Sequence, residues 1–273
     1  MTGSKVRKSA VAGQFYPGTA QELKKEIESL VDKNAEKQDC LACLLPHAGY
    51  MYSGRVAAET VSHINIKEKV ILLGPNHTGY GTPFSIMTEG TWLTPLGEVK
   101  IENGLAKNLL SCSRYLKDDA LAHTYEHSLE VELPFLQYFK SDFQIVPIAF
   151  MTDDLQALKD VGKEIASVIG VPEIKKSVMI VASSDMTHYE PQEEAIRKDN
   201  EAIKAILELD EDKLMERIRS LGISMCGYAP AIVMIAAAKA LGAKSAKLIK
   251  YQTSADVTGD RDSVVGYAGI ILY

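Results

Sequence analysis

The sequence has no run of about 18 uncharged apolar residues, which is the length that a transmembrane helix needs. Its first thirteen residues carry charge and contain no apolar core of the kind found in signal peptides. A membrane span and an export signal are therefore both excluded by the pattern. We expect a soluble protein of the cytoplasm.

Cysteine is also scarce, with four residues in 273, too few for a disulfide scaffold. Cys40 and Cys43 have the spacing of a redox or zinc half-motif, but no second pair completes a zinc site. Residues three apart on a strand face opposite sides of the sheet. The pattern therefore predicts two buried, unreactive thiols.

Basic residues are outnumbered, 30 against 36 acidic ones, and the net charge is −6. A protein that grips nucleic acid without sequence preference needs clustered Lys and Arg, so this class is excluded. The sequence also lacks a nucleophile elbow, a Walker lysine loop and a Gly-x-Gly-x-x-Gly turn after a strand. We expect no nucleotide cofactor, and a small molecule or a peptide as the ligand.

Apolar runs that alternate with helical patterns fill the rest of the chain. Such strands, interleaved with helices, predict one α/β domain over residues 1–273, with three αβα layers and a mostly parallel or mixed sheet. We found no repeat or linker that divides it. The expected strands are 40–45, 69–74, 84–88, 143–150, 177–184, 247–253 and 264–272, and the expected helices 53–63, 102–111, 128–139, 153–169, 193–207, 210–220 and 228–241.

Three of the strongest predicted strands are each followed closely by a histidine, namely His47, His77 and His188. Ligands of open α/β sheets bind beyond the carboxyl ends of the strands. A single such histidine is equally well read as a surface or loop-capping residue. Because imidazole suits both metal binding and proton transfer, the repetition predicts that His47 and His77 share a metal or catalytic pocket.

A fourth histidine, His127, lies in a cluster that opens the expected helix at 128–139. Ser128 is interpreted as the helix cap, with Glu130 and Glu132 solvated in the first turn. His127 either joins the pocket or is an ordinary surface residue, and the sequence favours neither. The acidic stretch 256–262 lacks the closing Glu of a calcium loop, so we expect a polar loop at the pocket rim.

Cys226 differs from the other cysteines because it directly precedes a helix expected to start near Pro230. A helix N-terminus favours the thiolate, which makes a better metal ligand or nucleophile. A small residue packed at a tight Cys226-Gly227 turn is the alternative.

Together these patterns resemble the MEMO family, over nearly the whole chain from about Arg7. The resemblance indicates a prokaryotic member and implies a fold similar to that of class III extradiol dioxygenases, of the LigB type. The motifs that carry it are AGQFYP at 12–17, PHAGY at 46–50, GPNH at 74–77, TPLGE at 94–98, EHS at 126–128, SDMTH at 184–188, CG at 226–227 and VGY at 265–267.

The resemblance also implies residue roles. Dioxygenases of this class hold Fe(II) with two histidines and a carboxylate. The two histidines match His47 and His77, and the carboxylate position matches Cys226. His188 matches the acid or base, with Asp185 beside it, and His127 matches a second pocket histidine. The expected catalytic residues are therefore His188, Asp185 and His127. Because thiolate is a soft ligand, it shifts the metal preference towards copper or zinc and leaves iron–thiolate binding open. We expect Fe(II) or Cu as the cofactor, and we do not expect the usual ring cleavage.

The resemblance to the family also implies partners. Its members bind metals, and eukaryotic ones recognise phosphotyrosine segments of receptors. In prokaryotes the genes often accompany those for AMMECR1-like and radical SAM proteins, which implies a shared pathway.

Three hypotheses follow. The first is a redox-type protein with one metal on His47, His77 and Cys226, and with Tyr50 or Tyr189 lining the pocket. The second is a non-catalytic module that binds a peptide or protein, for which the arginines near the loops are Arg55 and Arg261. The third is metal-free chemistry with Cys226 as the nucleophile and His188 or His47 as the base.

Overall fold

The computed structural model describes residues 6–273, and a twelve-stranded mixed sheet forms its centre. The main path of the sheet runs β1-β5-β6-β8-β3-β9-β2-β12-β10, with β11 paired to β12 and with β4 paired to β7 and β8. The strands are β1 (Val6–Arg7), β2 (Ala42–Leu45), β3 (Lys69–Pro75), β4 (Phe84–Ile86), β5 (Thr91–Thr94), β6 (Gly97–Ile101), β7 (Lys117–Asp118), β8 (Gln144–Phe150), β9 (Val178–Ser183), β10 (His188–Glu190), β11 (Ala246–Thr253) and β12 (Val264–Leu272).

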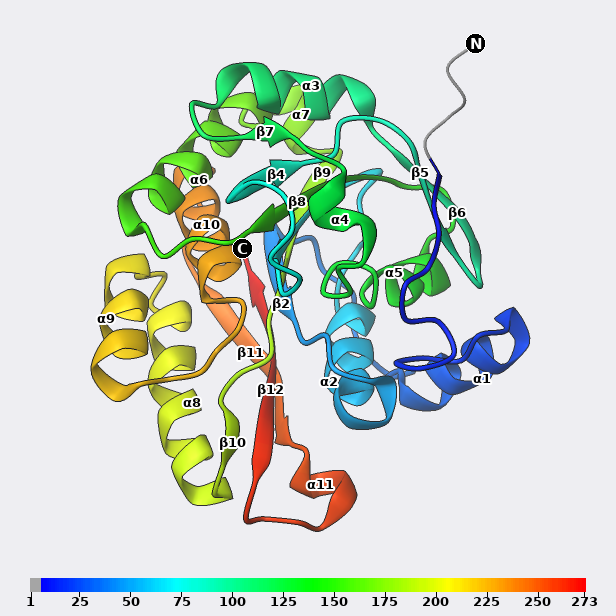
Figure 1. Cartoon of the computed structure of the whole chain (residues 1–273), viewed down its shortest axis with the longest axis vertical. Coiled ribbons are helices and arrows are strands. Elements are labelled where there is room, and N and C mark those ends of the chain that lie inside the picture. Colours follow the sequence, from blue (N-terminus) through cyan, green and yellow to red (C-terminus); the bar gives the residue numbers. More distant parts are fainter. Residues whose placement is uncertain (1–5) are drawn as a thin grey trace.

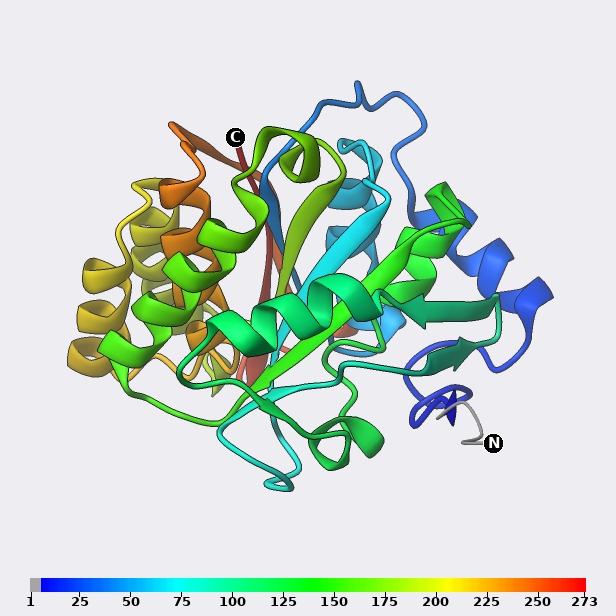
Figure 2. The same ribbon diagram turned by 90° about the horizontal axis from the view of Figure 1, so that it is seen from above.

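Helices cover both faces of this sheet (Figures 1 and 2). On one face α10 packs against β3 and β9, with α6 beside it; α2 packs against β11 and β12, together with α1 and α5, on the other. The expected three-layer α/β fold is confirmed. The helices are α1 (Ala20–Leu30), α2 (Tyr50–Ser62), α3 (Asn103–Cys112), α4 (Leu121–Thr124), α5 (Leu133–Phe139), α6 (Leu155–Ile169), α7 (Pro172–Lys175), α8 (Gln192–Leu207), α9 (Glu211–Leu221), α10 (Tyr228–Ala240) and α11 (Ala255–Thr258).

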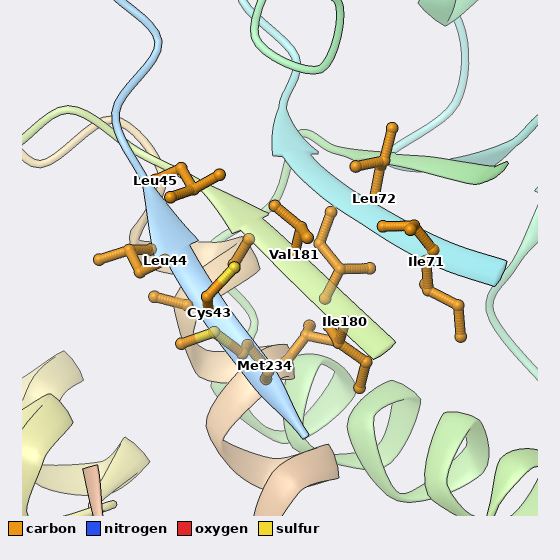
Figure 3. Close-up of a cluster of buried hydrophobic side chains, with 14 of the residues drawn as sticks. Cys43, Leu44, Leu45, Ile71, Leu72, Ile180, Val181 and Met234 are labelled. Carbon is orange, nitrogen blue, oxygen red and sulfur yellow. The ribbon is translucent and has the colours of Figure 1, made fainter. Parts of the chain in front are cut away.

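The centre of the sheet consists of β8, β3, β9 and β2, which are parallel neighbours. Their side chains are buried on both faces, which explains why these strands are almost continuously apolar. Figure 3 shows this packing around Cys43 of β2, Ile180 of β9 and Met234 of α10. Because the strands are parallel, the segments that follow β2, β3 and β9 leave the sheet at one edge.

One expected helix is corrected by the structure. Residues 128–132 form turns, and helix α5 begins at Leu133, not at Ser128. The Ser128 hydroxyl donates to the carbonyl of Pro75 at the end of β3 instead of capping a helix. Glu130 and Glu132, expected to be solvated, are fully buried. Hydrogen bonds to distant residues keep this segment in turns, although its local sequence pattern favours a helix.

The sequence interpretation also missed a helix and a hairpin. Helix α1 has a Thr19 cap and buries Leu23 and Ile27, which are four residues apart on one face. The hairpin of β5 and β6 turns at Gly97, whose φ of 125° favours glycine. Both signals are present in the sequence. No helix within residues 6–273 has the length and apolar character needed to cross a membrane.

Candidate metal and proton-transfer site

A cavity of about 660 Å³ lies at the edge of the sheet where β2, β3 and β9 end. His47 follows β2, His77 follows β3, and Asp185 and His188 follow β9. Side chains from the N-terminal segment and from the loop around α11 complete the wall. The lining residues are Gln14, Phe15, His47, Ala48, Gly49, Tyr52, His77, His127, Asp185, His188, Tyr189, Ser254, Thr258, Asp260, Ser263, Val265 and Tyr267.

Two histidines and a cysteine converge beside this cavity. Nitrogen atoms of His47 and His77 and the sulfur of Cys226 all lie within 4.8 Å of one another. Cys226 Sγ is 3.3 Å from His47 Nε2, and the ring centroids of His47 and His77 are 5.2 Å apart. The structure thus brings together all three residues that the resemblance implies as metal ligands.

His47 is buried, and its hydrogen bonds determine its tautomer. Its Nδ1 lies 2.7 Å from Ser183 Oγ, which also lies 2.8 Å from the carbonyl of Ser128. A carbonyl only accepts, so the single hydroxyl proton of Ser183 is already used and the imidazole must donate from Nδ1. The unprotonated Nε2 then faces Cys226. Burial, with the nearby His77 ring, lowers the pKa of His47 and keeps it neutral.

His77 is held by a different group. Its Nδ1 donates to Glu126 Oε1 at 2.9 Å, and its backbone amide donates to the other oxygen of the same carboxylate. Although burial opposes it, these bonds and the amide of Ser128 lower the pKa of Glu126 to about 2. An ionised carboxylate therefore orients His77 and engages its Nδ1, so that Nε2 is the ring nitrogen left for a ligand.

His127 joins the cavity, a question that the sequence left open. Its ring stacks on His77 with centroids 4.7 Å apart, and its Nδ1 lies 3.5 Å from Glu126. His77, Glu126 and His127 also offer three ligand atoms within 4.8 Å of one another. Glu126 already makes hydrogen bonds to His77 and Ser128, so orienting these rings accounts for its position.

The thiol of Cys226 accepts a hydrogen bond from the backbone amide of Asp185 at 3.3 Å. Burial and the neighbouring Asp185 carboxylate raise the pKa of Cys226. The expected thiolate at a helix N-terminus is therefore not favoured in the metal-free chain, because desolvation outweighs the helix dipole. Helix α10 begins at Tyr228, two residues after the cysteine.

Asp185 and His188 are the remaining residues predicted for proton transfer. The Asp185 carboxylate accepts from the amides of His47 and Ala48, while burial raises its pKa to about 6. His188 Nδ1 donates to the carbonyl of Ser224 at 2.9 Å, so Nε2 is the ring nitrogen left for other contacts. Beside it, Tyr189 is 78% exposed and has a φ of 58°.

Of the two tyrosines considered for the pocket, only Tyr189 lines it. Tyr50 is buried in the core, stacked on Phe135, and its hydroxyl donates to a backbone carbonyl. Tyr52 and Tyr267 line the cavity instead. Cys40 and Cys43 lie elsewhere as buried thiols, as expected, and burial raises the pKa of Cys40 to about 12.

Two close contacts that involve glycine bring the segments of the site together. A Cβ atom on Gly74, in β3, would lie 2.6 Å from Leu129 and 2.7 Å from the Ser128 hydroxyl. A Cβ atom on Gly227 would collide with the backbone of Ser183. Glycine at these positions lets the segment 126–132 and the Cys226 loop approach the strand ends.

Sequence reasoning missed Ser183, Glu126 and Glu132 as site residues. Glu126 adjoins His127 in a recognised motif, which was an available signal. Ser183 is the last residue of an apolar strand, and Glu132 has the spacing of a solvated helix residue, so neither had a local signal.

Comparison with known proteins gives a consistent result. A family model described as Memo-like protein matches residues 7–271. The chain is 44% identical to a MEMO1 family protein of Methanosarcina barkeri, covering 98% of this chain and all of the relative. It is 42% identical to one from Methanopyrus kandleri, covering 97% and 98% of the two chains.

A solved structure is similar in fold alone. An uncharacterized protein from Escherichia coli K12 superposes with a TM-score of 0.51 at 12% identity, covering 84% of this chain and 98% of that one. The family model and the relatives span nearly the whole sequence. The chain therefore belongs to the Memo-like protein family.

Proposed function

We propose that this protein binds one redox-active transition-metal ion, iron or copper, on His47, His77 and Cys226. The observation that carries the proposal is the convergence of three ligand atoms within 4.8 Å. They come from three separate segments of the chain, so local sequence does not account for their meeting.

The protonation of the donors supports the same conclusion. His47 and His77 each donate from Nδ1 to a fixed partner, which leaves the Nε2 lone pairs available for a metal. Cys226 lacks a cationic side chain among the contacts that set its pKa, so a bound cation is the natural partner for its thiolate. A 2-His-1-Cys set suits copper or iron, which would supply one-electron chemistry when bound.

Groups for proton transfer line the same cavity. Asp185, with its pKa raised to about 6, holds or releases a proton near neutral pH. His188 lines the cavity with its Nδ1 engaged at Ser224, and His127 lies beside His77. We propose Asp185 and His188 as the proton-transfer pair, with His127 as a further base. The reaction class is that of a metal-dependent oxidoreductase acting on a small molecule.

Metal analysis of untagged protein, produced and purified without air, tests the proposal. We expect up to one iron or copper ion per chain, lost in the His47→Ala/His77→Ala double variant. His63→Ala is the matched control, because the Nδ1 of His63 bonds only a backbone carbonyl within α2. Cys226→Ser should abolish any thiolate-to-metal absorption, whereas Cys112→Ser, at an exposed cysteine, should not.

Metal content in the double variant equal to that of the unmodified protein, under every loading condition, would refute this function. Equal loss in the His63→Ala control would assign the metal to nonspecific surface sites.

The alternative is a binding module for a peptide or protein, and a phosphorylated segment would need a cation in the pocket. Among residues 6–273, neither lysine nor arginine lines the cavity. Arg55 pairs with Glu59 on α2, and Arg261 is outside the lining. Binding that survives chelation and the Cys226→Ser change would support this alternative.

Metal-free cysteine chemistry is less well supported. The raised pKa of Cys226 leaves little thiolate at neutral pH, and its nearest base, His47, is itself hard to protonate because of burial. Thiol alkylation of the metal-free protein as a function of pH separates this possibility from the first.

A further inference from the structure

Behind His47 lies a carboxyl group with no assigned role. Glu132 Oε1 is 2.9 Å from the same Ser183 hydroxyl that accepts from His47, and the side chain is fully buried. We propose that Glu132 is a positioning residue that carries a proton, donates it to Ser183, and thereby fixes His47 with Nε2 toward the pocket.

Counting protons at Ser183 gives the first argument. Three polar atoms surround its oxygen: His47 Nδ1, the carbonyl of Ser128, and Glu132 Oε1. A hydroxyl has one proton to donate and can accept twice. If that proton goes to the carbonyl, the other two atoms must both donate. Glu132 can donate only as a carboxylic acid.

The surroundings of Glu132 give the second argument. Its other oxygen, Oε2, is buried without a hydrogen-bond partner within the described residues. The titratable groups that face it are Tyr50 from α2, Cys43 from β2 and Asp185 after β9, with His47 across Ser183. None of these brings a positive charge while His47 is neutral. Burial therefore raises the pKa of Glu132.

The arrangement determines what His47 can do. The Ser183 hydroxyl accepts a hydrogen bond from Glu132 and donates its own proton to the carbonyl of Ser128. The hydroxyl oxygen then has one lone pair left, which accepts from the imidazole of His47. The opposite tautomer, with Nδ1 unprotonated, finds no proton at Ser183. Glu132 thus stabilises the tautomer that presents Nε2 at the cavity.

This inference rests on the proposed function only for the use of His47 as a ligand, so its main test uses metal-free protein. We compare the folding equilibrium constants of the unmodified chain and Glu132→Gln from pH 5 upward. In the unfolded chain the carboxyl ionises near its ordinary pKa of 4.5, whereas in the folded chain it stays protonated. Stability of the unmodified chain should therefore fall as pH rises through this window, and the Gln variant should lack that loss.

The expected result is that the ratio of the two folding constants, variant over unmodified, rises about tenfold per pH unit up to the folded pKa. The matched control is Glu126→Gln, for which the ratio should stay level above pH 5, since that carboxyl is ionised in both states. A ratio for Glu132→Gln that is level or falls would overturn the proposal.

A second measurement holds if the variant does not fold. Infrared spectra of the unmodified, metal-free protein at pH 7 should contain the carbonyl band of a buried protonated carboxylic acid, and its absence would overturn the assignment. Ser183→Ala then tests the positioning role, with metal affinity reduced 10- to 100-fold. Unchanged affinity in protein that does bind metal would refute the role but leave the metal site intact.

Discussion

His47 and His77 face one cavity, yet the groups behind them differ in almost every respect. The side chain of His77 is 33% exposed and is held directly by an ionised carboxylate, Glu126. His47 is 2% exposed and is held by a neutral hydroxyl, Ser183. A carboxylate partner makes an imidazole a stronger electron-pair donor to a metal, whereas a hydroxyl mainly fixes the orientation of the ring. We therefore propose that the two residues differ as metal ligands, with His77 donating more electron density and His47 being held more rigidly.

The strongest way to break the comparison is to remove charge from the His77 side. Glu126→Gln at pH 7 should lower the free energy of unfolding by about 3 kcal/mol, since the folded pKa of about 2 lies below the ordinary 4.5. The contribution is present above pH 4.5 and is lost as pH falls toward 2. Denaturant unfolding at several pH values measures it. A difference in the free energy of unfolding between the unmodified protein and Glu126→Gln that stays constant down to pH 2.5 would contradict an ionised Glu126 carboxylate.

A substitution that crowds the segment behind both histidines should have the next largest effect on stability. Gly74→Ala places a Cβ against Leu129 and Ser128, whose segment carries both Glu126 and Glu132. We expect a loss of about 1–3 kcal/mol from overpacking, together with weaker metal binding. Gly79→Ala is an informative control for crowding, because a Cβ there meets no atom within 4 Å although its φ of 72° adds strain. Equal metal affinity in the two variants would show that the close approach at Gly74 is dispensable.

Removing the hydroxyl on the His47 side should lower the stability by about as much as Gly74→Ala, without adding an atom to a packed contact. Ser183→Ala leaves the Nδ1–H of His47 and the carbonyl of Ser128 without a partner, which costs about 1–3 kcal/mol and leaves the ring free to change tautomer. Nitrogen chemical shifts of the imidazole report the tautomer directly. If His47 kept Nδ1 protonated in this variant, the hydroxyl would not be what orients it.

The smallest effect is expected at His127. His127→Phe keeps the ring contacts with His77 and Phe15 but loses the long 3.5 Å contact between the His127 Nδ1 and the Glu126 carboxylate. We expect less than about 1 kcal/mol in stability and less than a tenfold change in metal affinity, because Glu126 still holds His77. A greater loss of affinity than in Glu126→Gln would make His127 a ligand in its own right.

Much of the candidate site could be predicted because two of its proposed ligands follow directly after predicted strands. His47 and His77 come directly after apolar strands, and parallel strands bring such residues to one edge. Cys226 could be placed near them only through the resemblance to a family, since its contact with His47 spans 179 residues. No periodicity or local spacing encodes that pairing.

The buried acids show where local pattern fails. Glu130 and Glu132 have the spacing of polar residues in a first helical turn, and the sequence predicts them to be exposed. Glu130 is instead bound by Arg7, 123 residues away, and by Tyr16, and Glu132 contacts Ser183. A charged residue becomes buried when distant partners satisfy it, and such partners are not visible in a local window.

The strand order has a consequence for how the protein is made. β9 lies between β3 and β2 in space but follows both by more than a hundred residues, and Cys226 comes later still. During synthesis both histidines emerge long before the strand that separates them, so the three proposed ligands come together only once folding is nearly finished. A metal that needs all three ligands would therefore bind the native state alone, and its capture would mark the end of folding and stabilise its product.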